Sequence, residues 1–136
     1  MQSAPFWPFC TQVKVVWRDL DAAGHVNNAV YLTYMETARV ETYFALTGGK
    51  RAAELDIILA RASVDYRSAA TLGETLIVEV RPGRVGETSF ILTYTLREKD
   101  TGRLVAEGES VLVSYDYELQ RKRPLPEALR ARLQAL

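Results

Sequence analysis

The chain has 136 residues, 48% of them hydrophobic, and its 17 Lys and Arg balance its 17 Asp and Glu. This length predicts a single domain, residues 1–136, with a core large enough to fold without disulfides or a structural metal. The balanced charge argues against a nucleic-acid partner, and no apolar run approaches the ~20 residues of a membrane span.

The first third of the chain predicts a strand, a polar loop and a long helix. Apolar residues alternate with others over residues 13–17, which predicts a strand. After the loop, residues 19–28, apolar residues recur at spacings of three and four over residues 31–46, which predicts a helix with a broad buried face. One of the two asparagines that end the loop suits the N-cap, and Gly48-Gly49 suits the C-terminal end.

The rest of the chain is expected to be mostly strands. They cover residues 57–66, 76–81, 90–97 and 104–115. Turns are predicted at Gly73, at Pro82-Gly83 and at Gly102, and links this short require antiparallel strands. Pro126 then opens a short C-terminal helix.

This order of elements predicts an α+β fold. The single long helix must bury its apolar face, and the sheet is the only large partner for it. We therefore expect an antiparallel five-stranded sheet wrapped around one long central helix. The exposed edges of such a sheet favour pairing with a second copy, so we expect a homodimer, or a tetramer built as a dimer of dimers.

The residues of the polar loop could form a catalytic site. The first N–H groups of a helix lack partners within it, and that end carries partial positive charge, which favours a developing oxyanion. Asp21, a few residues upstream, could attack a carbonyl polarised there or direct water at it. Gly24 would allow the backbone to turn or to approach a ligand closely. His25 could hydrogen-bond a substrate or hold the loop.

The same residues could instead have structural roles only. Asp19 and Asp21 favour turns, His25 could be a structural hydrogen-bonding residue, and Asn27 and Asn28 could be caps only. Judged from spacing alone, capping explains most of these residues.

Other candidate chemistry is weaker. The chain has one histidine and one cysteine, Cys10, so we expect no metal site and no intrachain disulfide, which fits a cytoplasmic protein. Glu36 and Arg39 are expected to pair along the helix, although Glu36 could face the cavity at the helix start. Tyr31 could line a substrate pocket, but packing in the core is the expected role for an aromatic residue at helical spacing.

The polar loop reads D-L-D-A-A-G-H-V-N-N from Asp19 to Asn28, and Tyr31 and E-T-A-R from Glu36 to Arg39 follow. This pattern resembles the signature of hotdog-fold acyl-CoA thioesterases, in particular the 4-hydroxybenzoyl-CoA thioesterase-like branch. Later segments are also similar to that family, so that the resemblance covers nearly the whole chain.

The resemblance implies an acyl-CoA thioesterase that needs no cofactor beyond the coenzyme A of its substrate. It implies that Asp21 is the catalytic carboxylate, as nucleophile or general base, and that N–H groups near Asn28 bind the thioester oxygen. His25 matches a histidine of the acyl-carrier-protein thioesterases. The candidate substrate-binding residues are Gly24, Asn27, Tyr31, Glu36 and Ser89.

The chain departs from these relatives at two places. The carrier-protein branch has an asparagine where this chain has Ala23, which argues against copying its mechanism. In the benzoyl branch, basic residues before a Ser-Phe pair bind the nucleotide phosphate, whereas Gly86-Glu87-Thr88 precede Ser89-Phe90 here. Arg81, Arg84 or the cluster 121–123 could replace them.

Four activities therefore stay open. The first expectation is hydrolysis of an acyl-CoA by a thioesterase. The alternatives are an acyl-carrier-protein thioesterase, a hotdog dehydratase with His25 as base, and a non-catalytic module that binds acyl thioesters. The acyl group itself is left open.

Overall fold

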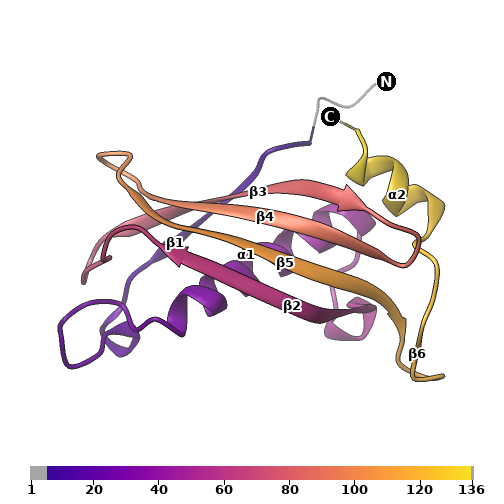
Figure 1. Cartoon of the computed structure of the whole chain (residues 1–136), viewed down its shortest axis with the longest axis horizontal. Coiled ribbons are helices and arrows are strands. Elements are labelled where there is room, and N and C mark those ends of the chain that lie inside the picture. The colour runs from indigo at the N-terminus through magenta and orange to yellow at the C-terminus, as the bar shows by residue number, and fades with distance from the viewer. Residues whose placement is uncertain (1–5, 136) are drawn as a thin grey trace.

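The computed structural model describes residues 6–135 (Figure 1). Residues 1–5 and 136, which belong to the predicted single domain, lie outside the described residues. In chain order the elements are β1 (Phe9–Lys14), the 3₁₀ turn η1 (Trp17–Asp19), α1 (Val30–Thr47), the 3₁₀ turn η2 (Ala52–Glu54), β2 (Ile57–Tyr66), β3 (Thr75–Val85), β4 (Ser89–Glu98), β5 (Leu104–Asp116), β6 (Arg121–Lys122) and α2 (Glu127–Leu133).

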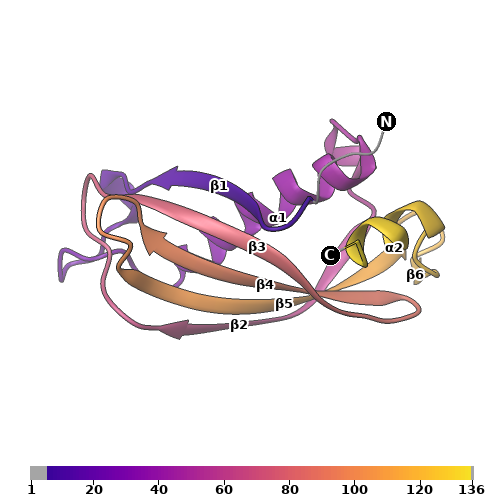
Figure 2. The same cartoon turned by 90° about the horizontal axis from the view of Figure 1, so that it is seen from above.

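The sheet has the order β1-β3-β4-β5-β2, and each neighbouring pair is antiparallel. The two-residue strand β6 extends it by pairing with the end of β5. Figures 1 and 2 show a curved sheet with α1 running along one of its faces. The expected α+β architecture, five main strands around one long helix, is confirmed, and β6 is an addition to it.

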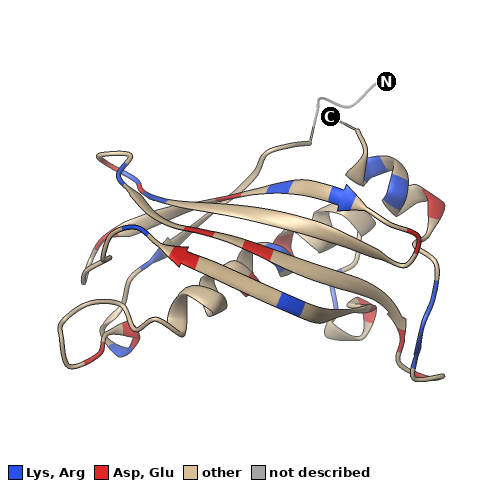
Figure 3. Ribbon diagram, in the orientation of Figure 1, with Lys and Arg blue, Asp and Glu red and all other residues tan. Residues whose placement is uncertain are grey.

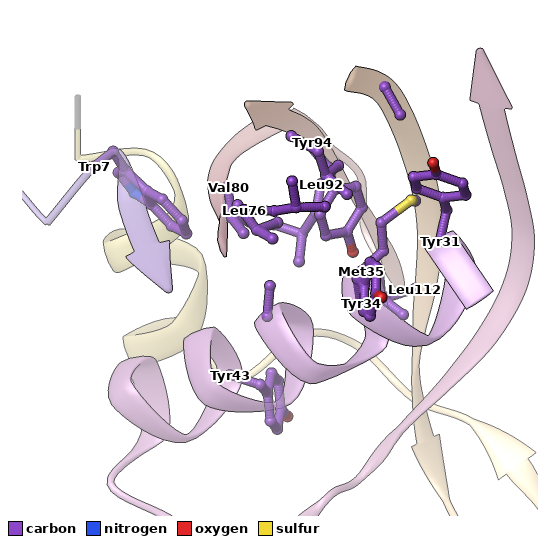
Figure 4. Close-up of a cluster of buried hydrophobic side chains, with 14 of the residues drawn as sticks. Trp7, Tyr31, Tyr34, Met35, Tyr43, Leu76, Val80, Leu92, Tyr94 and Leu112 are labelled. Carbon is purple, nitrogen blue, oxygen red and sulfur yellow. The ribbon is translucent and has the colours of Figure 1, made fainter. Parts of the chain in front are cut away.

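The core lies between α1 and the inner face of the sheet. Side chains of β3 and β4 alternate between buried and partly exposed, as residues do on a sheet with one covered face. The fully buried residues of these strands include Leu76, Val78, Val80, Phe90, Leu92, Tyr94 and Leu96. Figure 4 shows several of them opposite Tyr34 and Met35 of α1. Burial of each large apolar side chain contributes about 1.5–3 kcal/mol, so this layer holds helix and sheet together.

Helix and sheet approach each other closely at Gly108 of β5. A Cβ atom on Gly108 would lie 2.6 Å from Cε of Met35 and 3.0 Å from the carbonyl oxygen of Ser63. Met35 is only 1% exposed, so its side chain has little room to move away. The missing side chain of Gly108 therefore makes room for Met35.

The first strand lies earlier in the chain than the sequence predicted. β1 ends at Lys14, and Trp17 belongs to the turn η1 instead of the strand. The physical reason is local, because Oδ2 of Asp19 accepts a hydrogen bond from the Val16 N–H at 3.0 Å and closes this turn.

The turn predicted at Pro82-Gly83 is also wrong. β3 continues through both residues to Val85, with irregular pairing to β4 between Pro82 and Val85. An irregularity of this kind is where a strand tolerates proline. The chain turns instead at Gly86, whose N–H donates to the Ser89 carbonyl at 2.7 Å.

The helix ends agree with the sequence in part. Gly48 closes α1 with a φ of +78°, and its N–H donates to the Phe44 carbonyl at 2.8 Å, as a C-terminal glycine does. At the other end the prediction of an asparagine N-cap is wrong, because Ala29 occupies that position. Asn27 lies two residues before it, and its Oδ1 accepts a hydrogen bond from the Ala29 N–H at 2.9 Å. α2 begins directly after Pro126, as predicted.

The two ends of the described chain meet beside α2. Nε1 of Trp7 donates to the Arg132 carbonyl at 3.1 Å, and the Trp7 side chain is buried. Within residues 6–135, no helix combines the length and the apolarity that a membrane span requires.

Candidate functional site

A pocket of about 300 Å³ opens beside the N-terminal end of α1. One wall is the loop between η1 and α1, and the other is the end of β2 with the segment that follows it. Figure 1 shows the loop and this end of β2 at the same end of the sheet. The lining residues are Asp21, His25, Val26, Asn28, Tyr31, Tyr66, Arg67, Ser68 and Ala69.

The loop is a tight turn that presents Asp21 and His25 to the pocket. Leu20 and Val26 form an isolated antiparallel bridge, and the Asp21 N–H donates to the His25 carbonyl at 3.0 Å. The Gly24 N–H donates back to the Asp21 carbonyl at 3.0 Å, with a φ of +81° at Gly24. This left-handed conformation suits glycine, so Gly24 shapes the turn at its tip.

The Asp21 carboxylate is exposed to solvent and only partly engaged. Its Oδ1 accepts from the Ala23 N–H at 2.9 Å, a hydrogen bond within its own turn. Within residues 6–135 no other donor reaches this carboxylate, and Asp21 lines the pocket, so its second oxygen has no protein partner. A carboxylate in this state can act as a base or as a nucleophile.

The start of α1 offers a backbone donor to the same pocket. The Ala29 N–H donates to Oδ1 of Asn27, and the Val30 N–H donates to the Asn27 carbonyl at 2.9 Å. The N–H of Asn28 between them has no acceptor among residues 6–135. It lies at the positive end of the helix dipole, which suits an oxygen that gains negative charge.

Tyr66, at the end of β2, was missed by the sequence reasoning. Its hydroxyl donates to the Asn28 carbonyl at 2.8 Å, and its ring meets that of Tyr31 edge-on, with centroids 5.3 Å apart. In the sequence Tyr66 looks like any aromatic residue of a strand. No local signal connects it with a loop 38 residues away.

Tyr31 is buried and fixes the pocket wall. Its hydroxyl oxygen accepts from the Ala70 N–H at 3.2 Å, and the Ala70 carbonyl accepts from the Val26 N–H at 3.0 Å. Burial is the main cause that raises the pKa of Tyr31, which keeps the hydroxyl neutral. Tyr31 is therefore packed in the core, as its spacing along the helix predicted, and its role in substrate binding stays a prediction.

Arg103 holds the same wall from the other side and was also missed. Its Nε donates to Oγ of Ser68 at 3.1 Å, and one Nη donates to the Ala69 carbonyl at 3.1 Å. The guanidinium also contacts both carboxylate oxygens of Glu74, at 3.0 and 3.1 Å. A guanidinium pairs well with a carboxylate in this two-point geometry, so the wall is anchored to the turn before β3.

The other residues singled out in the sequence lie away from this pocket. Glu36 lines a separate recess of about 160 Å³ between α1 and β2, where it pairs with Arg39 at 3.7 Å. Ser89 lies in another pocket with Arg84, near the turn between β3 and β4. Of the predicted residues, the pocket brings together Asp21, His25, Asn28 and Tyr31, while Asn27 and Gly24 shape its loop.

Cationic side chains lie at both ends of the sheet. Figure 3 shows blue segments on β3 and on α2 and others at the end where the polar loop lies. At the pocket itself the lining cation is Arg67, which pairs with Glu107 at 3.1 Å. Within residues 6–135 no three His, Cys, Asp or Glu side chains are grouped as metal ligands.

A larger cavity, of about 730 Å³, lies at the other end of α1 beside α2. Its two carboxylates already have partners: Asp56 accepts from the Tyr43 hydroxyl and pairs with Arg123, and Glu54 accepts from the Arg51 N–H. It offers no free carboxylate next to a free N–H, so the smaller pocket is the candidate active site.

This chain is similar to known proteins in sequence and in fold. A family model described as the thioesterase-like superfamily matches residues 15–133. The long-chain acyl-CoA thioesterase FadM of Escherichia coli (strain K12) is 27% identical over 132 residues, which cover 93% of this chain and 97% of FadM. A thioesterase from Thermus thermophilus, solved in complex with coenzyme A and Zn, is 39% identical, covers 93% of this chain and 97% of its own, and superposes with a TM-score of 0.82. A predicted thioesterase from Bacillus stearothermophilus is 25% identical, covers 93% of each chain and has a TM-score of 0.86.

Proposed function

Because this chain belongs to the thioesterase-like superfamily and is an acyl-CoA thioester hydrolase, we propose that the pocket at the start of α1 is its active site. The expected hotdog fold, a curved antiparallel sheet around a long helix, agrees with the solved relatives. One observation carries the proposal: the same pocket is lined by Asp21, whose carboxylate is only partly engaged, and by Asn28, whose N–H has no acceptor among residues 6–135.

In the proposed reaction the thioester carbonyl oxygen accepts a hydrogen bond from the Asn28 N–H. This donor and the helix dipole stabilise the negative charge that the oxygen gains when the carbonyl is attacked. Either Asp21 takes a proton from a water molecule that attacks the carbon, or its carboxylate attacks and the resulting anhydride is hydrolysed. The C–S bond breaks in both routes, and coenzyme A leaves as a thiolate that needs no strong acid.

His25 has a supporting role in this proposal. Its side chain lines the pocket, while its backbone carbonyl closes the loop through the Asp21 N–H. We propose that the imidazole hydrogen-bonds the substrate near the thioester. The proposed chemistry uses only side chains and backbone groups of this chain, with coenzyme A as part of the substrate.

We further propose that the protein is a homodimer joined along β2. This edge strand exposes Ile58 and Leu59, which are 40% and 45% exposed, and Leu32 of α1 lies beside Leu59 with 42% exposure. Apolar residues along a free strand edge favour pairing with another strand. The assembly of two such dimers into a tetramer stays a prediction.

Antiparallel pairing of two β2 strands would also complete the site. It reverses the second sheet, so the β3–β4 turn of the partner lies at the end where Asp21 of the first protomer lies. Ser89 of the partner subunit would then be available to the nucleotide part of coenzyme A. This arrangement explains how Ser89 can serve a substrate bound at a pocket that is remote from it within one protomer.

The test is thiol release from aliphatic and aromatic acyl-CoAs by the intact protein, by Asp21→Asn and by Asp19→Asn. We expect turnover by the intact protein, loss of turnover in Asp21→Asn and retention in Asp19→Asn, because an amide oxygen can still accept the hydrogen bonds that Asp19 accepts. Near-normal turnover by Asp21→Asn would contradict the mechanism.

The same assay separates the alternatives. Turnover only when the acyl group is attached to an acyl carrier protein would identify a carrier-protein thioesterase. Loss of water from a 3-hydroxyacyl thioester would identify a dehydratase. Tight acyl-CoA binding by the intact protein without turnover would identify a binding module.

A further inference from the structure

The backbone around Asn28 is held on both sides. The peptide group before Asn28 is fixed through the Asn27 carbonyl, which accepts from the Val30 N–H at 2.9 Å. The peptide group after Asn28 is fixed twice, because the Ala29 N–H donates to Oδ1 of Asn27 and the Asn28 carbonyl accepts from Tyr66. The Asn28 N–H belongs to the first of these peptide groups, and because the second group is also held, rotation about Asn28 is restricted and the N–H has a defined direction.

These hydrogen bonds connect residues at different separations along the chain. Those formed by Ala29 and Val30 span two or three residues and set the shape of the turn. The bond from Tyr66 comes from the end of β2, on the opposite wall of the pocket, and spans 38 residues. It therefore fixes where the turn lies relative to the space that a substrate would occupy.

The Tyr66 ring is itself held in place. It packs edge-on against Tyr31, with an angle of 70° between the rings. Tyr31 is itself 2% exposed, and its hydroxyl oxygen accepts a hydrogen bond from the Ala70 N–H. Tyr66 is 47% exposed, so its hydroxyl adds little to the core. A side chain that contributes little burial but orients one peptide group has a role best explained by the site.

We propose that Tyr66 is a positioning residue for thioester hydrolysis, because its hydroxyl holds the Asn28 carbonyl and thereby restrains the backbone of Asn28 with its N–H directed at the thioester oxygen. This inference rests on the proposed function of the pocket. It adds a residue that the polar loop itself does not contain.

The expected kinetic signature follows from this role. Removal of a donor to a developing oxyanion lowers kcat by about 10²–10³-fold, and a donor that is displaced loses part of that effect. Stabilisation that acts in the transition state changes kcat more than KM. We therefore expect Tyr66→Phe to lower kcat by about tenfold, with KM nearly unchanged.

The chain offers a matched control in Tyr117. Its hydroxyl donates to the Ile57 carbonyl at 2.7 Å, and it is 53% exposed, yet it lies at the other end of β2. Tyr117→Phe removes the same kind of bond from a strand end without touching the pocket. We expect it to leave kcat and KM unchanged.

A second readout does not depend on turnover. In NMR spectra of the intact protein and both variants, the Asn28 amide resonance should shift in Tyr66→Phe and stay in place in Tyr117→Phe. A Tyr66→Phe variant with an unmoved Asn28 resonance, with unchanged kcat or with a rise in KM alone would overturn the inference. A shifted resonance in a protein that hydrolyses no thioester would instead show that the proposed function has failed.

Discussion

The hydroxyl of Tyr34 donates a hydrogen bond to Oδ2 of Asp19 at 2.8 Å, and the same oxygen accepts from the Val16 N–H at 3.0 Å. Burial, together with this bond to a carboxylate, raises the pKa of Tyr34, so the hydroxyl remains a donor. The two aspartates of the loop thus differ in kind. Asp19 ties the loop to α1, while Asp21 faces the pocket.

This difference predicts that two alanine substitutions lower the free energy of unfolding by different amounts. Asp19→Ala leaves the hydroxyl of Tyr34, a residue 5% exposed, without its acceptor, and we expect the free energy of unfolding to fall by about 1–3 kcal/mol. Asp21→Ala removes one exposed bond within a turn, and we expect a loss of less than about 1 kcal/mol. Urea denaturation measures both, and a larger loss for Asp21→Ala would contradict the assignment.

The close contact at Gly108 predicts a coupled pair of substitutions. We expect Gly108→Ala to lower the free energy of unfolding by about 1–3 kcal/mol, because the new methyl group would overlap Met35. In a Met35→Ala background the same change should cost less, since the obstructing side chain is gone. Chemical denaturation of all four proteins measures this coupling, and an equal cost in both backgrounds would place the obstruction at the Ser63 carbonyl instead.

The Arg103–Glu74 pair predicts a dependence of stability on pH. The hydrogen bond from the Arg103 guanidinium is the main cause that holds the pKa of Glu74 below its usual value. A carboxyl group with a lowered pKa in the folded state stabilises the protein above its unfolded-state pKa, about 4.3, and loses that contribution as the pH falls through the folded-state value.

We therefore expect Glu74→Gln to be less stable than the intact protein at pH 7, by about 1 kcal/mol or less. This difference should shrink as the pH is lowered from about 5 to below 4, because Glu74 becomes protonated there. Urea denaturation at a series of pH values measures it. A difference that does not change with pH would show that the loss does not come from the ionised state of Glu74.

The exposed edge of β2 predicts a change of oligomeric state. We expect the intact protein to be a dimer by light scattering and Leu59→Lys to be a monomer, because a charge there would be buried against the partner. Turnover should fall in the monomer, since the partner's part of the site is lost. Gln12→Lys, on the other edge strand, is the control and should remain a dimer. A dimeric Leu59→Lys would assign the interface to another surface.

Much of this fold could be predicted from local patterns. The alternation along β3 and β4, the spacing of three and four along α1 and the stop at Gly48 each follow from contacts between near neighbours in the chain. The polar loop could be placed at the start of α1 for the same reason. Pro82-Gly83 shows the limit, because pairing with β4 carries the strand past a local turn signal.

The walls of the site could not be predicted in this way. Tyr66 lines the pocket and Arg103 supports its wall because β2 pairs with β5, a partner that no short pattern specifies. Ser89 was selected by resemblance and Glu36 also by its place on the helix, and within one protomer they lie in other recesses. The loop supplies the candidate reacting groups, and the topology supplies what orients them.

The contact of Trp7 with Arg132 keeps this tryptophan buried, so the two tryptophans of the chain should differ in their fluorescence. The chain has two tryptophans, of which Trp7 is 7% exposed at the junction of the chain ends and Trp17 is 77% exposed beside the polar loop. Indole emission shifts to longer wavelength in water, so unfolding should shift the emission of Trp7 and leave that of Trp17 nearly constant. A Trp7→Phe protein would then carry one fluorophore, two residues from Asp19, with which to follow ligands entering the pocket.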